Sequence, residues 1–293
     1  IFAFFGACVG LFGIGTFSQV NGISSAVVGF FDPDKSLAVT IPGLGTYSWV
    51  VVIASLVLTF CVAAVIIGGV KRIASVSQVV VPFMAIIYFI FALALVLFNI
   101  KEVPQAIVTI VQAAFNPKAV TGGVVGSMLV AMQNGVARGI FSNEAGLGSA
   151  PIAAAAAQTK EPVRQGLVSM TGTFIDTIVI CTLTGLSVVI TGAWQVEGLE
   201  GVQVTTYAFQ NGLPFSNQFC AAVLMICLVF FAFTTILGWD YYGERCLEYL
   251  TGKDEKKIKI YRWLYILAVF IGPYMTVAAV WTIADIFNGL MAL

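Results

Sequence analysis

The chain has 293 residues, of which 59% are hydrophobic and 10% charged, with a formal net charge of zero. An ordinary soluble domain carries about 25% charged residues, so a soluble core does not account for this composition. The balanced charge and scattered basic residues indicate no nucleic-acid partner. The chain has no histidine, which excludes His-dependent hydrolysis and His-based proton relays. These properties favour a membrane protein.

Uncharged segments recur along the chain, and a bilayer-spanning helix needs about 20 apolar residues. The pattern predicts spans at roughly 1–30, 47–70, 76–99, 121–157, 165–192, 214–246 and 260–282, with another starting at 283. Turn-forming residues separate several of them, as at Pro42-Gly43 and Asn116-Pro117. We therefore expect an all-α membrane protein with a single transmembrane domain over 1–293, truncated at both ends.

Lys and Arg predict the orientation, because the basic residues of short loops stay cytoplasmic. If the first span runs outward, ten basic residues fall inside: Lys71, Arg72, Lys160, Arg164, Arg245, Lys253, Lys256, Lys257, Lys259 and Arg262. Only Lys35, Lys101 and Lys118 fall outside, and Arg138 lies within a span. The expected location is the plasma membrane of a prokaryotic cell. Two short uncharged segments on the outside, 104–115 and 202–211, are interpreted as interfacial or re-entrant helices.

The segment from Gln133 to Pro151 combines four glycines with polar and charged residues between two apolar half-spans. A charge in the centre of a membrane helix costs about 2.5 to 3.5 kcal/mol on insertion scales, so Arg138 and Glu144 must face protein or water. We expect a discontinuous helix at about 121–157, broken between Gly139 and Gly146, whose freed backbone groups line a cavity. The alternative is that Arg138 and Glu144 form a packing ion pair.

Three further groups are candidates for binding. Asp176 lies in the middle of the fifth span and could couple to ions or protons, or pair with Arg138. Thr234 and Thr235 could supply hydroxyl ligands to Na⁺, with Trp239 on the same helix face as Thr235. Their alternative is hydrogen bonding within their own helix. Gln19 and Asn21 in the first span could bind a substrate or another helix, whereas Gly6, Gly10, Gly13 and Gly15 indicate close helix packing.

The run from Asn134 to Ala157 resembles the signature of the alanine or glycine:cation symporter family, which has a five-plus-five inverted-repeat fold. Gly13–Ser24 and Phe233–Glu244 are also similar to that family. The resemblance implies that 1–30 is transmembrane helix 3, that the broken span is helix 6, that 214–246 is helix 8 and that the chain ends within helix 10. Helices 1 and 2 would then be absent.

The resemblance also assigns roles by position. Phe141, Ser142 and Asn143 correspond to the helix 6 part of the substrate site, and Gln19 to the helix 3 part. Thr234 and Thr235 correspond to the helix 8 sodium position, with the Phe231 carbonyl as a further ligand. Trp239 would line the pocket and favour a small substrate.

The expected function is symport of alanine or glycine with Na⁺ by alternating access, without an organic cofactor. H⁺ coupling in the same fold is the main alternative. A channel would need a continuous polar stripe, which is not found. An intramembrane enzyme would need a Ser-Lys or paired-Asp constellation in facing spans, so no catalytic residue is expected.

Overall fold

The computed structural model describes residues 1–34, 36–41, 45–115, 124–144 and 146–292. The predicted turns at Pro42-Gly43 and Asn116-Pro117 lie outside these ranges. The described chain is almost entirely helical and forms two compact units, residues 1–88 with 221–293 and residues 89–220. The boundaries fall within α4 (Val70–Phe98) and α11 (Asn217–Thr251).

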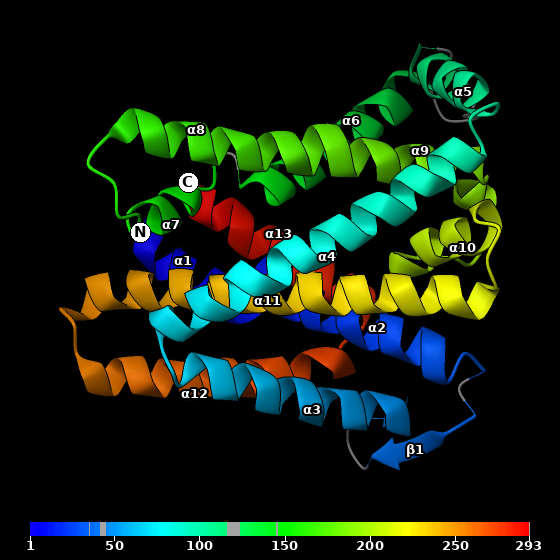
Figure 1. Ribbon diagram of the computed structural model, residues 1–293. Coiled ribbons are helices and arrows are strands. Elements are labelled where there is room, and N and C mark those ends of the chain that lie inside the picture. The colour runs from blue at the N-terminus through cyan, green and yellow to red at the C-terminus, as the bar shows by residue number, and fades with distance from the viewer. Residues whose placement is uncertain (35, 42–44, 116–123, 145, 293) are drawn as a thin grey trace. The chain divides into compact units, whose positions relative to one another are not determined.

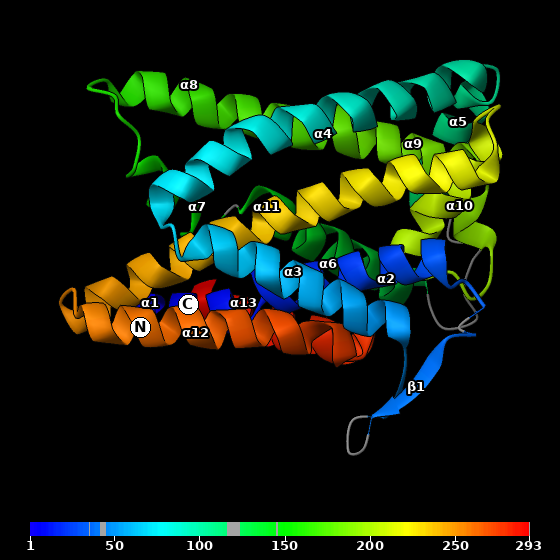
Figure 2. The same ribbon diagram turned by 60° about the horizontal axis from the view of Figure 1, so that its bottom comes forward.

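The first unit contains the two ends of the chain. Its remaining elements are α1 (Phe2–Phe12), the π-helix η1 (Ile14–Ser18), α2 (Gln19–Phe31), β1 (Ala38–Ile41), β2 (Gly45–Ser48), α3 (Trp49–Ile66), α12 (Glu255–Ile271), the 3₁₀ turn η4 (Gly272–Tyr274) and α13 (Val277–Ala292). α3 lies beside α12 (Figure 1, Figure 2), and α1 packs against α13. The antiparallel β1–β2 hairpin was not predicted from the sequence.

The second unit contains the interrupted helix. Its elements are α5 (Val103–Phe115), α6 (Val124–Asn143), α7 (Ala150–Ala154), α8 (Pro162–Thr173), the π-helix η2 (Phe174–Cys181), α9 (Thr182–Ile190), the 3₁₀ turn η3 (Ala193–Gln195) and α10 (Val202–Gly212). α5 and α10 are the two short helices expected at 104–115 and 202–211, and both pack on α9.

Five helices of the described chain are long and apolar enough to cross a membrane, by length and composition: Phe2–Phe31, Trp49–Ile66, Val70–Phe98, Pro162–Ile190 and Asn217–Thr251. Many of their large apolar side chains point outward; Phe60 on α3, for example, is 75% exposed. Such a surface is costly in water and ordinary in contact with lipid tails. The predicted all-α membrane class is confirmed.

The boundary predicted between the seventh span and the next one is wrong. The span expected at 260–282 ends at Ile271, and the next helix begins at Val277 rather than at 283. Between them, Gly272-Pro273 forms a short 3₁₀ turn. Proline has no N–H for the helical ladder and clashes with the preceding turn, so the apolar sequence continues while the helix does not.

Close packing in the first unit depends on glycine. A Cβ added to Gly6 would lie 2.7 Å from the Cys246 sulfur, and one added to Gly10 would lie 3.2 Å from the Gly243 Cα. The expected packing role is confirmed for these two residues and for Gly15. The atoms nearest to Gly13 belong instead to Val9 of the preceding turn.

Candidate functional site

The discontinuity in the predicted helix 6 is real, but it lies later than expected. α6 continues through Phe141, Ser142 and Asn143, and the chain turns only at Glu144, whose φ is 52°. Gly146 and Gly148 follow with φ of 78° and 77°, and α7 then begins at Ala150. Positive φ ends a helix, whereas Gly139 is accommodated inside one. The helix therefore ends after Asn143 rather than near Gly139, and Phe141–Asn143 form the last turn of α6.

This last turn meets the π-helix η2 through polar side chains. The Ser142 hydroxyl donates a hydrogen bond to Asp176, and the Thr177 hydroxyl donates to the Asn143 side-chain oxygen at 2.9 Å. Thr177 also lies 3.4 Å from the Asp176 carboxylate. The structure thus joins three predicted site residues and adds Thr177, which the sequence interpretation missed. π-helical turns are rare and occur frequently at functional sites.

The two charged residues of the interrupted helix have contacts close by in the chain. The Arg138 guanidinium lies 5.1 Å from the centre of the Phe141 ring, within cation–π range. Glu144 accepts a hydrogen bond of 2.8 Å from the buried Ser149 hydroxyl. This hydrogen bond therefore links the two ends of the break, Glu144 at one end and Ser149 at the other.

The predicted sodium ligands lie together on α11. Thr235 donates to the Phe231 carbonyl at 3.0 Å, and the Thr234 hydroxyl lies 3.0 Å from the same carbonyl and 3.1 Å from that of Phe230. These are the intrahelical bonds of the alternative interpretation. A hydroxyl that donates its proton keeps its lone pairs, so both threonine oxygens can still accept or coordinate. Neutral oxygens of this kind are ligands that a hard monovalent cation favours.

Trp239 packs against the helix that carries Gln19. The indole is 4% exposed, and a Cβ added to Gly15 would lie 1.8 Å from its Cγ. The structure therefore gives Trp239 a packing contact on the π-helix η1, which ends just before Gln19. Asn21 donates to the Met275 carbonyl at 2.9 Å, so its contact is with another helical segment.

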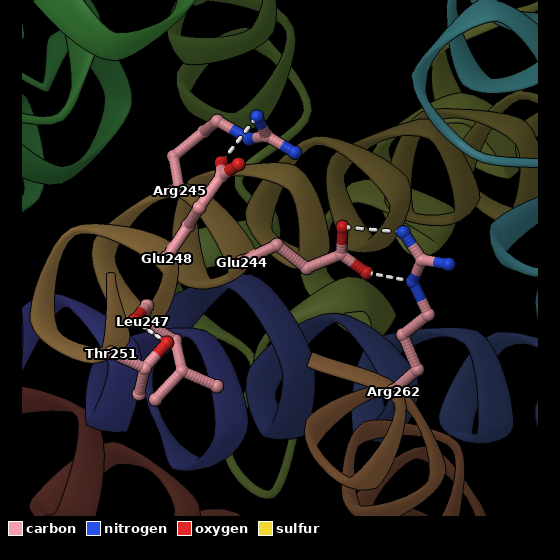
Figure 3. A network of polar contacts seen from close by, with 6 residues as sticks. All are labelled: Glu244, Arg245, Leu247, Glu248, Thr251 and Arg262. Atoms are coloured by element: carbon pink, nitrogen blue, oxygen red, sulfur yellow. Dashed lines mark hydrogen bonds and ion pairs between the residues drawn. The ribbon is translucent and has the colours of Figure 1, made fainter. Parts of the chain in front are cut away.

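α11 carries two acidic groups that the sequence interpretation did not single out. Arg262 of α12 donates to both oxygens of Glu244, through Nη2 at 2.9 Å and through Nε (Figure 3). Asp240, one turn earlier, is 1% exposed. Both residues lie near the end of the predicted span 214–246. α11 in fact continues to Thr251.

Long apolar helices, an interrupted helix and polar groups gathered at helical irregularities are typical of multi-pass membrane transporters. Residues 1–293 match the family described as the sodium:alanine symporter family, and the chain belongs to that family.

Similar proteins include an uncharacterized transporter of Haemophilus influenzae, 53% identical over 293 residues, which covers 100% of this chain and 60% of that protein. The sodium/alanine symporter AgcS of Methanococcus maripaludis is 44% identical over 100% of this chain and 59% of its own length. The amino-acid carrier protein AlsT of Bacillus subtilis is 36% identical over 94% of this chain and 54% of its own length. The chain therefore spans less than two thirds of these relatives.

Proposed function

We propose that the full-length protein moves alanine or glycine into the cell together with Na⁺ by alternating access, within a five-plus-five fold of which this chain supplies helices 3 to 9 and part of helix 10. The observation that carries the proposal is the cluster of Ser142, Asn143, Asp176 and Thr177 beside the break in α6. The relative named as a sodium/alanine symporter supports this choice of substrate and ion.

The end of α6 is suited to the ammonium group of an amino acid. The last four carbonyls of a helix have no intrahelical partner, and they carry the negative end of the helix dipole. Phe141, Ser142 and Asn143 lie in this turn. In our proposal, their carbonyls and polar side chains hold the substrate, and the substrate-binding roles that the family resemblance implies for Gln19 and Trp239 stay predictions. Arg138, Glu144 and Asp176 would stabilise the backbone conformation of the break or control access to the substrate.

The coupling Na⁺ is assigned to the Phe231 carbonyl and the Thr234 and Thr235 hydroxyls. Na⁺ favours oxygen ligands, and these three supply them without a fixed charge. The helix itself holds the three oxygens together, since both hydroxyls already lie against the same carbonyl.

The experiment is Thr235→Ala in the full-length protein, with sodium-dependent alanine uptake measured in proteoliposomes. Loss of an oxygen ligand should raise the Na⁺ concentration for half-maximal uptake, while alanine affinity at saturating Na⁺ changes less, because saturating cation masks a weakened cation site. Thr251→Ala is the matched control, since Thr251 makes the same kind of intrahelical bond, to Leu247 at 2.9 Å, further along α11 (Figure 3). Unchanged sodium dependence in Thr234→Ala, Thr235→Ala and the double variant would contradict the assignment.

H⁺ coupling is the second candidate, and Asp176 is the observation that favours it. This carboxylate lies in a membrane-spanning helix and contacts two hydroxyls of the proposed substrate cluster. Under H⁺ coupling, an inward pH gradient should drive alanine uptake in the absence of Na⁺, and Asp176→Asn should abolish it. Under Na⁺ coupling, the pH gradient alone should drive nothing.

A further inference from the structure

Asp240 is a buried carboxylic acid in the interior of a membrane-spanning helix. Its side chain is 1% exposed, and within the described part of the chain neither carboxylate oxygen has a hydrogen-bond partner. Most buried polar atoms in proteins are hydrogen bonded, and an isolated buried carboxylate ion is among the costliest groups that a protein can contain. This residue therefore needs an explanation that the proposed substrate and sodium sites do not supply.

Groups that could balance a negative charge are near Asp240 but have other partners. The charged and titratable neighbours are Glu244 on its own helix and Arg262, Tyr261 and Tyr265 on α12. Arg262 is bound by both oxygens of Glu244. The Tyr261 hydroxyl donates to the Ala7 carbonyl at 2.9 Å, and that of Tyr265 donates to the Ile236 carbonyl at 2.7 Å.

The other packed helices do not supply a counter-charge. α1 has no charged residue between Phe2 and Phe12. On α13, which packs against α1, Asp285 is exposed and the buried polar residue is Asn288. An acid without any donor is stable in such surroundings only when it carries its own proton.

The space near Asp240, where α1, α11 and α12 meet, suits a proton better than a metal ion. A Cβ added to Gly10 would lie 3.2 Å from the Trp239 carbonyl oxygen and 2.5 Å from the Tyr261 hydroxyl, so α1, α11 and α12 are already in close contact. The described residues contain no group of three or more acidic, cysteine or histidine side chains that could hold a metal. A proton, unlike a metal ion, needs no such group of ligands.

We propose that Asp240 is an intramembrane proton-binding site, which holds its proton in the packed conformation described here and releases it when the contacts of α1 and α12 with α11 loosen during transport. Proton binding and conformation are then linked, because the ionised acid favours the looser state and the protonated acid the packed one. The release of the proton during transport rests on the proposed alanine symport, whereas the presence of a proton on Asp240 does not.

The first experiment detects the proton directly in the purified full-length protein. Infrared spectroscopy should show the carbonyl stretch of a protonated, buried carboxylic acid near neutral pH, and Asp240→Asn should remove it. Asp34→Asn, which changes an acid in an exposed turn, is the control and should leave the band intact. A band that survives in Asp240→Asn, or the absence of any such band in the wild type, would overturn the proposal even if alanine transport is normal.

The second experiment measures sodium-driven alanine exchange in proteoliposomes across roughly pH 5 to pH 9. The wild type should lose activity as the pH rises, and Asp240→Asn, which keeps the shape of the protonated acid, should flatten this profile. Asp240→Glu keeps the acid and should shift the midpoint, which provides a readout if the Asn variant does not fold. A changed Na⁺ requirement with an unchanged pH profile would identify Asp240 as a cation ligand instead and refute the proton site. Absence of alanine exchange in the wild type would refute the proposed function alone.

Discussion

Individual glycines decide how closely the helices of the first unit approach one another. Gly10 and Gly243 are so close to the Tyr261 hydroxyl that added Cβ atoms would lie 2.5 Å and 1.9 Å from it. Gly15 has the Trp239 side chain directly over its backbone. Without a strong hydrophobic force between helices in lipid, such contacts are a main source of packing energy.

Gly15→Ala should therefore destabilise the full-length protein. The new methyl group would overlap the Trp239 ring, and overpacking of this kind costs about 1 to 3 kcal/mol or more. Gly22→Ala on α2 is the matched control, because nothing lies within 4 Å of its added Cβ. Thermal unfolding in detergent should show a lower midpoint for Gly15→Ala and an equal or higher one for Gly22→Ala, since alanine favours helices. Equal midpoints for the two variants would mean that the Gly15–Trp239 contact is not tight in the folded protein.

At the scale of elements, the sequence predicts where the helices lie better than where they change type. Glycines and charges at 133–151 correctly indicate an interrupted helix, but glycine density cannot distinguish Gly139, which remains helical, from Gly146, which has a positive φ. The π-helices η1 and η2 leave no hydrophobic-pattern signal that a short window can detect. The contact between Asn143 and Thr177 depends on such a turn and was not predictable.

The break in α6 should depend on Gly146 and not on Gly139. Gly146→Ala places a Cβ in the left-handed region, which costs roughly 1 to 2 kcal/mol, whereas Gly139→Ala should favour the helix. Sodium-dependent alanine uptake, normalised to the amount of folded protein, should fall in Gly146→Ala and persist in Gly139→Ala. The reverse result would move the break back to the position predicted from the sequence.

The connection from α2 through β1 should be sensitive to acid. Hydrogen bonds to Asp32 from the Ser48 hydroxyl, and then from Ser36 and the Leu37 N–H, lower the pKa of this carboxyl. A lowered pKa means that the stabilisation is complete above the unfolded value, about 3.9, and is lost as the pH falls through the folded value. Ser48 also accepts the Val50 N–H at the start of α3. Protonation of Asp32 should therefore weaken the start of α3 as well as the connection that follows α2.

The protection of residues 36–41 and 45–50 against hydrogen exchange, measured relative to the intrinsic exchange rate at each pH, should therefore fall below about pH 4 in the wild type. In Asp32→Asn the exchange should already be faster at neutral pH and should respond less to acid. Asp34→Asn, in the same turn, serves as the control because its side chain is exposed. An acid response retained in Asp32→Asn would assign the effect to another group.

For the whole molecule, charge and apolar length predict the class, and the comparisons confirm it. The seventh span was misplaced because Gly272-Pro273 interrupts a sequence that stays apolar on both sides. Asp240 was not singled out because it lies near the end of the predicted span 214–246, where a charge is ordinary, whereas α11 continues to Thr251. Which residues bind substrate and cation remains a prediction.

The predicted orientation can be tested by labelling cysteines in a cysteine-free version of the full-length protein. Lys256→Cys, near the start of α12, should react with a membrane-impermeant maleimide only in inside-out vesicles, and Glu200→Cys only in intact cells. Both side chains are exposed, so accessibility should depend on the side of the membrane alone. Labelling of both residues from the same side would contradict the charge-based topology.

The π-helices also affect how this chain tolerates changes in length. A π turn holds one residue more than an α turn, so η1 and η2 each amount to an insertion that the helix has absorbed. Deleting one residue there would restore regular α geometry and leave the residues beyond it in nearly their present directions. A one-residue deletion in the regular turns of α1, in contrast, would rotate Gln19 by about 100° while leaving the apolar length sufficient to cross a bilayer. The helix would then keep its hydrophobicity, but Gln19 would lie on a different side of it.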